Sequence, residues 1–200
     1  MAVNTAYATA QQYREATGKT DKAQDAEITT DLTAISRYLD GKLGRFFSQD
    51  MEPVTRTYIP DTYTDGLWVD DLAEPPVIIK IDTRRNGKYE TELDASDYEL
   101  LPLNADKGPE PRPFTRIQLT FWGSYACFTP RERVQVTARY GWPEIPEAIQ
   151  RATIHLTAIL RLESPRATRR IAEIGETIEA SMDAQIIIRQ LTDQYKVWRL

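Results

Sequence analysis

The stretch that decides the fold is Val134-Gln-Val-Thr-Ala-Arg-Tyr-Gly-Trp-Pro143, together with the residues that follow it as far as Leu160. Val134, Val136 and Ala138 alternate with polar residues, and this period of two is typical of a strand with one buried face. The alternation stops at the Gly-Trp-Pro sequence, and a helical pattern begins a few residues later. We therefore expect a sheet and helices that occupy separate parts of the chain.

A long helix is predicted over residues 145–163. Pro146 suits its first turn, because the missing N–H of proline has no helical partner at that position. Apolar residues then recur at three- and four-residue steps and form one stripe, made up of Ile145, Ile149, Ala152, Leu156, Ile159 and Leu160. Pro165 stops the helix, which we expect to pack on the core.

Two further helices are predicted near the N-terminus, over residues 5–17 and 25–46. Gly18 separates them, and Gly41 and Gly44 mark the end of the second. Apolar residues at helical spacing support both, namely Tyr7, Ala10, Tyr13 and Ala16 in the first and Ile28, Leu32, Ile35, Leu39 and Leu43 in the second.

Between these helices, residues 54–140 read as strands and turns, because runs of β-branched and aromatic residues alternate with Pro, Gly, Asn and Asp. Val77–Ile81 and Lys88–Leu93 flank Asn86-Gly87, a dipeptide preferred in two-residue hairpin turns, so this segment predicts an antiparallel hairpin. A strand is also expected over Thr115–Phe121. The region predicts an antiparallel sheet with one solvated face.

Residues 166–180 are charged, and Gly175 interrupts the helical pattern of this segment, which we expect to be an arm. A last helix is predicted from Ser181, with one apolar side that comprises Ala184, Ile187, Ile188, Leu191, Tyr195 and Trp198. Two interpretations of this stripe remain open. It packs on its own core, or it docks into a groove of a neighbouring protein.

The predicted fold class is α+β: a small helical bundle with a central antiparallel β insertion. The bundle consists of two N-terminal helices, the long helix after Pro146 and one C-terminal helix. With 41% hydrophobic residues, a chain of this length suits one core. We expect a single domain over residues 1–165, followed by the charged arm and the C-terminal helix over residues 166–200.

Composition restricts the function. The formal charge of −5 disfavours tight binding to a phosphate backbone, whereas a channel through which DNA slides tolerates such a charge. No stretch approaches the roughly 18 apolar residues of a membrane span, so no membrane contact is expected. Cys127 is the only cysteine, which suits a reducing cytoplasm, and we expect it to be a small buried residue.

Reactive side chains are scarce. His155 is the only histidine and lies on an apolar helix, where a packing or surface role is the simpler interpretation. Five carboxylates fall close together, at Asp61, Asp65, Asp70, Asp71 and Glu74, but their spacing fits no calcium loop and suits a solvated turn. We expect no catalytic residue, cofactor or metal and hence no enzyme; divalent-cation chemistry at the acidic stretch is the rival interpretation.

Two other groups of residues have alternative interpretations. The one basic cluster contains Arg161, Arg166, Arg169 and Arg170, which either contact DNA or an acidic partner or favour the negative end of a helix. Exposed tryptophans on a β scaffold, at Trp68, Trp122 or Trp142, would suit a carbohydrate- or protein-binding module.

Several segments, taken in order, resemble the head-tail connector (adaptor, head-completion) family of long-tailed bacteriophages. They are Arg45-Phe46-Phe47, Arg56-Thr57-Tyr58, Leu67–Leu72, Asp97–Pro102, Gly108-Pro109, Phe114–Ile117 and Val134–Pro143 leading through Ile145-Pro146 into a helix. The resemblance spans most of the chain, although the β region and the segment after Pro165 are longer than in shorter members of the family.

This resemblance implies a structural virion protein that forms a ring, twelve-fold to match the portal, at the head-tail interface. The ring would extend the DNA channel and offer an attachment surface to a downstream neck or tail-completion protein, after assembly in the bacterial host cytoplasm. The resemblance implies that Ser181–Leu200 docks to the portal as a segment, and its candidate docking residues are Ile187, Leu191, Tyr195 and Trp198. The packaged double-stranded DNA would pass through the channel. Another neck or tail-completion role is the alternative.

Overall fold

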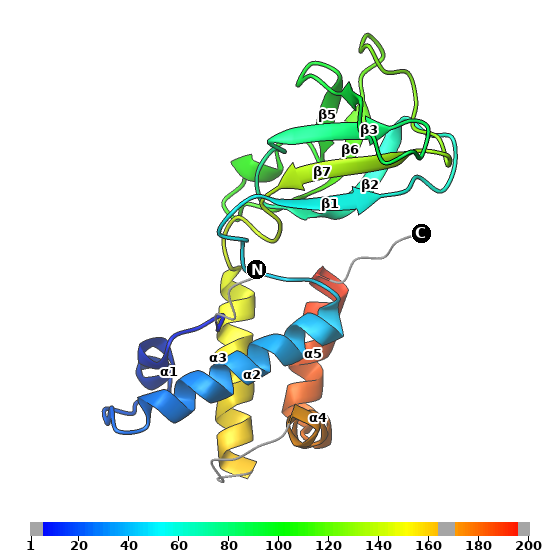
Figure 1. The fold of residues 1–200 in the computed structure, drawn as a ribbon. Coiled ribbons are helices and arrows are strands. Elements are labelled where there is room, and N and C mark those ends of the chain that lie inside the picture. The colour runs from blue at the N-terminus through cyan, green and yellow to red at the C-terminus, as the bar shows by residue number, and fades with distance from the viewer. Residues whose placement is uncertain (1–5, 164–170, 196–200) are drawn as a thin grey trace. The chain divides into compact units, whose positions relative to one another are not determined.

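The computed structural model describes residues 6–163 and 171–195. The chain divides into two compact units (Figure 1). One comprises Ser48–Glu144 and is called the β unit; the other joins residues 6–47 to residues 145–163 and 171–195 and is called the helical unit. The predicted α+β class is confirmed, because the antiparallel strands all lie between the second and third helices of the chain.

Five helices form the described part of the helical unit: α1 (Ala10–Thr17), α2 (Asp25–Leu43), α3 (Glu147–Glu163), α4 (Ile171–Ala180) and α5 (Met182–Tyr195). α2 and α3 each contact all the other helices and together form the centre of the unit. The apolar stripes predicted for α2 and α3 are buried, including Leu32, Leu39, Leu156 and Leu160 at 0% exposure. Burial of these stripes explains why short amphipathic helices are stable here.

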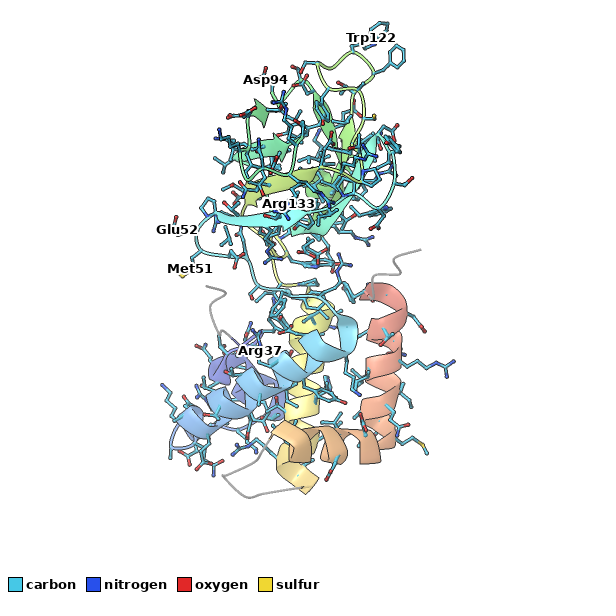
Figure 2. The ribbon with its side chains drawn as sticks, turned by 45° about the vertical axis from the view of Figure 1, so that its right-hand side comes forward. Arg37, Met51, Glu52, Asp94, Trp122 and Arg133 are labelled. Atoms are coloured by element: carbon cyan, nitrogen blue, oxygen red, sulfur yellow. The ribbon has the colours of Figure 1, made fainter. Side chains whose placement is uncertain are left out.

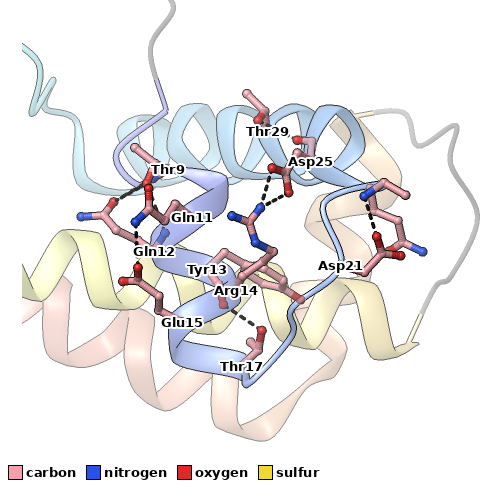
Figure 3. A network of polar contacts seen from close by, with 12 residues as sticks. Thr9, Gln11, Gln12, Tyr13, Arg14, Glu15, Thr17, Asp21, Asp25 and Thr29 are labelled. Atoms are coloured by element: carbon pink, nitrogen blue, oxygen red, sulfur yellow. Dashed lines mark hydrogen bonds and ion pairs between the residues drawn. The ribbon is translucent and has the colours of Figure 1, made fainter.

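The first helix begins at Ala10 rather than at residue 5, because Thr9 caps it (Figure 3). The Thr9 hydroxyl accepts the Gln12 amide N–H at 3.2 Å, and the Gln12 side chain accepts the Thr9 N–H at 2.8 Å. This reciprocal pair is a capping box. An ion pair between Arg14 and Asp25 then connects α1 to the start of α2.

The second half of the arm expected over residues 166–180 is a helix, α4, so this part of the prediction is wrong. α4 runs through Gly175 without interruption, and Ile174 and Ile178 are buried. α4 contacts α2, α3 and α5, so burial of its apolar side outweighs the low helix propensity of glycine. Residues 166–170 lie outside the described part of the chain, and the domain boundary expected after residue 165 stays a prediction.

The β unit contains seven strands among its described residues: β1 (Val54–Tyr58), β2 (Gly66–Leu72), β3 (Ile78–Asp82), β4 (Thr91–Glu92), β5 (Tyr98–Leu101), β6 (Phe114–Leu119) and β7 (Arg133–Ala138). They form a sheet of order β1-β7-β3-β4 and a sheet of order β2-β6-β5, and every pairing is antiparallel. The inward residues of both sheets share one core, in which Val134, Val136 and Ala138 are completely buried, as their alternation predicted.

The predicted hairpin is present and pairs β3 with β4, but the prediction of a two-residue turn at Asn86-Gly87 is wrong. The connection spans residues 83–90, and Gly87 (φ 80°) has positive φ whereas Asn86 does not. The carboxylate of Asp82 organises this loop by accepting the N–H groups of Arg84, Asn86 and Gly87 at 3.2, 3.2 and 2.8 Å. A buried carboxylate has replaced the tight turn as the local constraint.

Candidate functional site

Three of the segments that carry the family resemblance meet around Tyr140 in the β unit. The Arg56 guanidinium, from β1, stacks 3.8 Å from the centre of the Tyr140 ring. Its Nη1 donates to Oδ2 of Asp70, on β2, at 2.9 Å, and the Tyr58 hydroxyl donates to the same oxygen at 3.1 Å. Residues of these three segments therefore come together in one contact network, which connects the two sheets.

The protonation states of this network are fixed by its surroundings. Burial, and then the contact with Tyr58, raise the pKa of Tyr140, whose hydroxyl donates to the Val136 carbonyl at 2.9 Å. Burial opposes the charge of Arg56, but its bond to Asp70 raises the pKa of the guanidinium overall. The network thus contains a protonated phenol and a paired cation, which suits a structural role rather than acid–base chemistry.

The Gly-Trp sequence after β7 has a packing role. Gly141 has φ of 107°, and a Cβ added there would lie 2.0 Å from the Ser48 carbonyl oxygen, so glycine is required. Trp142 is buried, and its Nε1 donates to the Asp71 carboxylate at 3.2 Å. Trp142 is therefore not available as an exposed binding residue.

The acidic stretch does not gather around a common point. Asp70 and Asp71 bind Arg56 and Trp142, while Glu74 accepts from Arg139 at 2.9 Å and from Gln49 at 2.7 Å. Within the part of the chain that the structure describes, no three potential metal ligands lie close enough to hold an ion. Asp65 lies 3.7 Å from Nη2 of Arg116, so Asp65, Asp70, Asp71 and Glu74 pair with cationic, indole and amide groups of the β unit.

The two most exposed aromatic residues lie at the end of a loop that follows β6 (Figure 2). Phe121 and Trp122 are 89% and 90% exposed, and their ring centres are 4.8 Å apart in an edge-to-face pair. The strand expected to reach Phe121 ends at Leu119 instead. Thr120–Pro130 contains no charged residue, and this is the feature of the sequence that marks the loop as distinct.

Asp97 holds this loop in place. Its carboxylate accepts the Ser124 N–H at 2.6 Å, the Ser124 hydroxyl at 3.0 Å and the Asp94 N–H at 2.9 Å. These bonds, that of the Ser124 amide first, hold the pKa of Asp97 below its usual value. An ionised, buried carboxylate therefore fixes the base of the aromatic loop.

The basic cluster is described only in part. Arg161 lies at the end of α3, where Nη1 contacts Asp31 of α2 at 2.6 Å and Nη2 contacts Gln24 at 2.8 Å. Its side chain thus connects α3 to α2 within the helical unit. Arg166, Arg169 and Arg170 lie outside the described residues, and contact with DNA or a partner stays a prediction.

The C-terminal helix packs within the helical unit. Leu191 and Tyr195 are buried, Ile187 is half-buried, and the Tyr195 ring meets Phe47 edge to face at 5.5 Å. The exposed side of α5 instead presents Met182 and Ile186, which are 77% and 51% exposed. Trp198 lies outside the described residues, so the docking role of this stripe stays a prediction.

The single cysteine and histidine are both on the surface. Cys127 is exposed, which corrects the expectation that it is buried, because it lies on the loop beyond the aromatic pair rather than on a strand. His155 is exposed on α3. Among the described helices, none combines the length and apolar character needed to cross a membrane.

Comparison with known proteins identifies the fold. No family model matches the chain, and no curated protein is significantly similar to it in sequence. Among solved structures, it is similar to a chain in the neck of an empty gene transfer agent particle computed with C6 symmetry. The TM-score is 0.56 at 15% identity, over 96% of this chain and 90% of that chain.

Two further structures agree. The virion of the native gene transfer agent contains a chain with a TM-score of 0.56 at 16% identity, again over 96% and 90% of the two chains. The neck of the native particle computed with C12 symmetry gives 0.53 at 15% identity, over 95% and 88%. The chain therefore has the fold of proteins found in virion necks, which confirms at the level of the fold the resemblance noted in the sequence.

Proposed function

We propose that this chain is a head-to-tail connector: a structural virion protein that forms a ring under the portal. The observation that carries the proposal is a likeness over nearly the whole chain to components of particle necks, two of which were computed with C6 and C12 symmetry. Twelve copies would match a twelve-fold portal, extend the DNA channel and offer a surface to the next neck or tail-completion protein.

The charge balance supports a role around moving DNA. Thirty acidic against 25 basic residues leave the chain negative, so a channel made of many copies would not hold the phosphate backbone tightly. In the helical unit, Arg161 faces Asp31 and Glu27 at 2.6 and 3.8 Å, which reduces the positive charge offered to a phosphate.

The portal-facing segment in this proposal is α5. Because Leu191 and Tyr195 are buried in the helical unit, the contact with the portal is made first through the exposed side of the helix, at Met182 and Ile186. A helix that lies on a partner through one exposed face is a common mode of protein recognition.

The test is to add the purified full chain to DNA-filled heads that carry a portal but no neck, followed by sedimentation and electron microscopy. The expected result is a ring at the portal vertex. Ile186→Asp should prevent attachment, whereas Leu162→Asp, at a residue 82% exposed on α3, should not. Failure of the unaltered chain to attach would contradict the proposal; equal attachment of both variants would place the portal contact elsewhere.

A further inference from the structure

The loop after β6 presents two large aromatic side chains where turns normally carry small or polar ones. The Thr120 carbonyl accepts the Gly123 N–H at 3.2 Å, so Phe121 and Trp122 occupy the two central positions of the turn. Gly, Pro, Asn, Asp and Ser dominate such turns. Because both rings are about nine-tenths exposed and touch each other, they form one apolar projection, called here the aromatic tip (Phe121 and Trp122).

The aromatic tip is held in a fixed position. The Thr120 N–H donates to the Asp97 carbonyl, and the Thr120 hydroxyl donates to the Ser96 carbonyl, both at 2.9 Å. Gly123 packs so closely that an added Cβ would lie 3.1 Å from the Asp97 Cα. A projection ordered in advance loses little conformational entropy when it binds, which favours a role in recognition.

The chemistry of the loop selects a protein partner. Thr120–Pro130 carries no charged residue, whereas aromatic residues that stack on single-stranded nucleic acid lie in basic grooves. A surface that combines another aromatic ring with a delocalised cation would suit the tip, through edge-to-face and cation–π contacts.

The same β unit carries such a surface on the outer side of the sheet β2-β6-β5. Trp68 is 60% exposed and pairs with Arg116, whose guanidinium carbon lies 5.4 Å from the indole ring. A Cβ added at Gly66 would lie 2.1 Å from Nη2 of Arg116, so the guanidinium extends across the space that this glycine leaves. Gly66, Trp68 and Arg116 are called here the Trp68 face.

We infer that the aromatic tip of one copy of this chain binds the Trp68 face of a second copy. The inference rests on the proposed ring, because a ring of identical subunits joins two different patches of each subunit. In the single chain Trp68 is 60% exposed, the Arg116 side chain beside it is partly exposed, and Phe121 and Trp122 are about nine-tenths exposed, so the tip does not cover its own Trp68 face.

The size of the contact fits a ring better than a stable dimer. Two aromatic side chains bury about 150–250 Å² each, which is roughly half of the ~800 Å² per partner of a standard interface. Such a contact is weak by itself and becomes effective when it is repeated around a ring. The purified chain is therefore expected to be a monomer when dilute.

A disulfide trap tests the contact with purified full chains that all carry Cys127→Ser. One preparation carries Phe121→Cys, which keeps Trp122. The other carries Glu99→Cys; Glu99 is exposed and pairs with Gln118, beside Arg116 on the outer side of the same sheet. After mixing at high concentration and oxidation, the heterodimer should exceed both homodimers.

The matched control replaces Glu99→Cys by Thr57→Cys, an exposed strand residue on the other sheet. The inference requires that Phe121→Cys and Glu99→Cys give clearly more disulfide-linked heterodimer than Phe121→Cys and Thr57→Cys. Adding Trp122→Ser to the Phe121→Cys chain should remove this excess. Equal cross-linking with Thr57→Cys would mean random collision and would overturn it.

This test is independent of phage heads. A positive trap with a chain that does not attach to heads would overturn the connector role and keep the contact between copies. If the chain forms a ring at the portal but shows no excess of the specific cross-link, the contact between copies is overturned and the connector role stands. This holds even if Trp122→Ser blocks attachment, because the tip would then bind another neck component.

Discussion

Helix α5 of the helical unit and the loop after β6 of the β unit place their large apolar side chains in opposite ways. In the helical unit, the stripe of α5 that suggested a docking surface is covered, with Leu191 and Tyr195 only 5% and 4% exposed. In the β unit, Phe121 and Trp122 follow a strand and yet are almost completely exposed. The periodicity of apolar residues thus predicts which side chains of α5 are buried. The exposed position of Phe121 and Trp122 becomes evident only from the hydrogen bonds that hold their loop.

The two units also differ in how they treat buried carboxylates. In the helical unit, burial raises the pKa of Asp40 to about 6, against the opposing effects of Tyr7 and Arg37. In the β unit, burial is outweighed at Asp82 by the N–H groups of Gly87, Asn86 and Arg84, which lower the pKa of its carboxyl. The two units should therefore respond in opposite directions to acid.

The largest expected effect sharpens the contrast between the covered and the exposed side of α5. Leu191→Ala should lower the free energy of unfolding by about 2–5 kcal/mol, because it leaves a cavity in the helical unit. Ile186→Ala, on the exposed side of the same helix, should change it by less than about 0.5 kcal/mol. Urea unfolding followed by circular dichroism measures both, and equal losses would show that the stripe is not packed in solution.

A pH dependence of the helical unit is the next largest effect. The pKa of Asp40 rises from 3.8 to about 6 on folding, so its contribution to stability is fully present below about pH 3.8 and is lost as the pH rises through about 6. A difference of about two pH units corresponds to about 3 kcal/mol. Asp40→Asn should remove this dependence. Amide exchange of α2 between pH 4 and pH 7 measures it, and parallel profiles for both proteins would contradict it.

Asp97 should show the opposite sign in the β unit. Its pKa is lowered on folding, so the stability that it contributes is present at neutral pH and is lost as the pH falls through the folded value. Asp97→Asn should speed amide exchange at Thr120 and Ser124 at pH 7, whereas the exposed Asp94→Asn should not. Protection of the unaltered loop, taken relative to the intrinsic exchange rate at each pH, that stays the same or rises in acid would contradict this assignment.

The smallest effect on stability belongs to the aromatic tip. Trp122→Ser should leave the free energy of unfolding within about 0.5 kcal/mol of the unaltered chain, because the side chain touches little of its own β unit. It should nevertheless abolish association at high concentration in sedimentation velocity. Tyr63→Ser, another exposed aromatic at 68%, should not. A large loss of stability for Trp122→Ser would show that the tip is packed rather than presented.

Helix positions could be predicted well from the sequence because their apolar spacing is local information. The second helix starts at Asp25 and the third ends at Glu163, as expected. The second ends at Leu43 rather than at residue 46, because Gly44 caps it in the left-handed conformation, and the third begins at Glu147 rather than at residue 145. α4 could not be predicted, because a glycine within a charged segment argues against a helix until α2 and α3 are known to cover its apolar side. The hairpin turn failed for a similar reason, since Asp82 overrides the local preference of Asn86-Gly87.

The candidate sites were less accessible from the sequence. The sequence contains the motifs around Arg56, Asp70 and Tyr140, but only the fold brings them into one network. The sequence offers Trp122 as one of three candidate binding tryptophans, while its pattern places the neighbouring Phe121 on a strand. What distinguishes it from the buried Trp142 is the turn held by Asp97, a contact between residues far apart in the sequence.

The most direct test of the central claim is a cryo-electron microscopy reconstruction of neckless, portal-bearing heads after addition of the full chain. We expect a closed twelve-fold ring at the portal vertex, in which residues 121–122 of each copy lie against Trp68 of the next. Heads without added density, or copies bound singly without contact to one another, would contradict it.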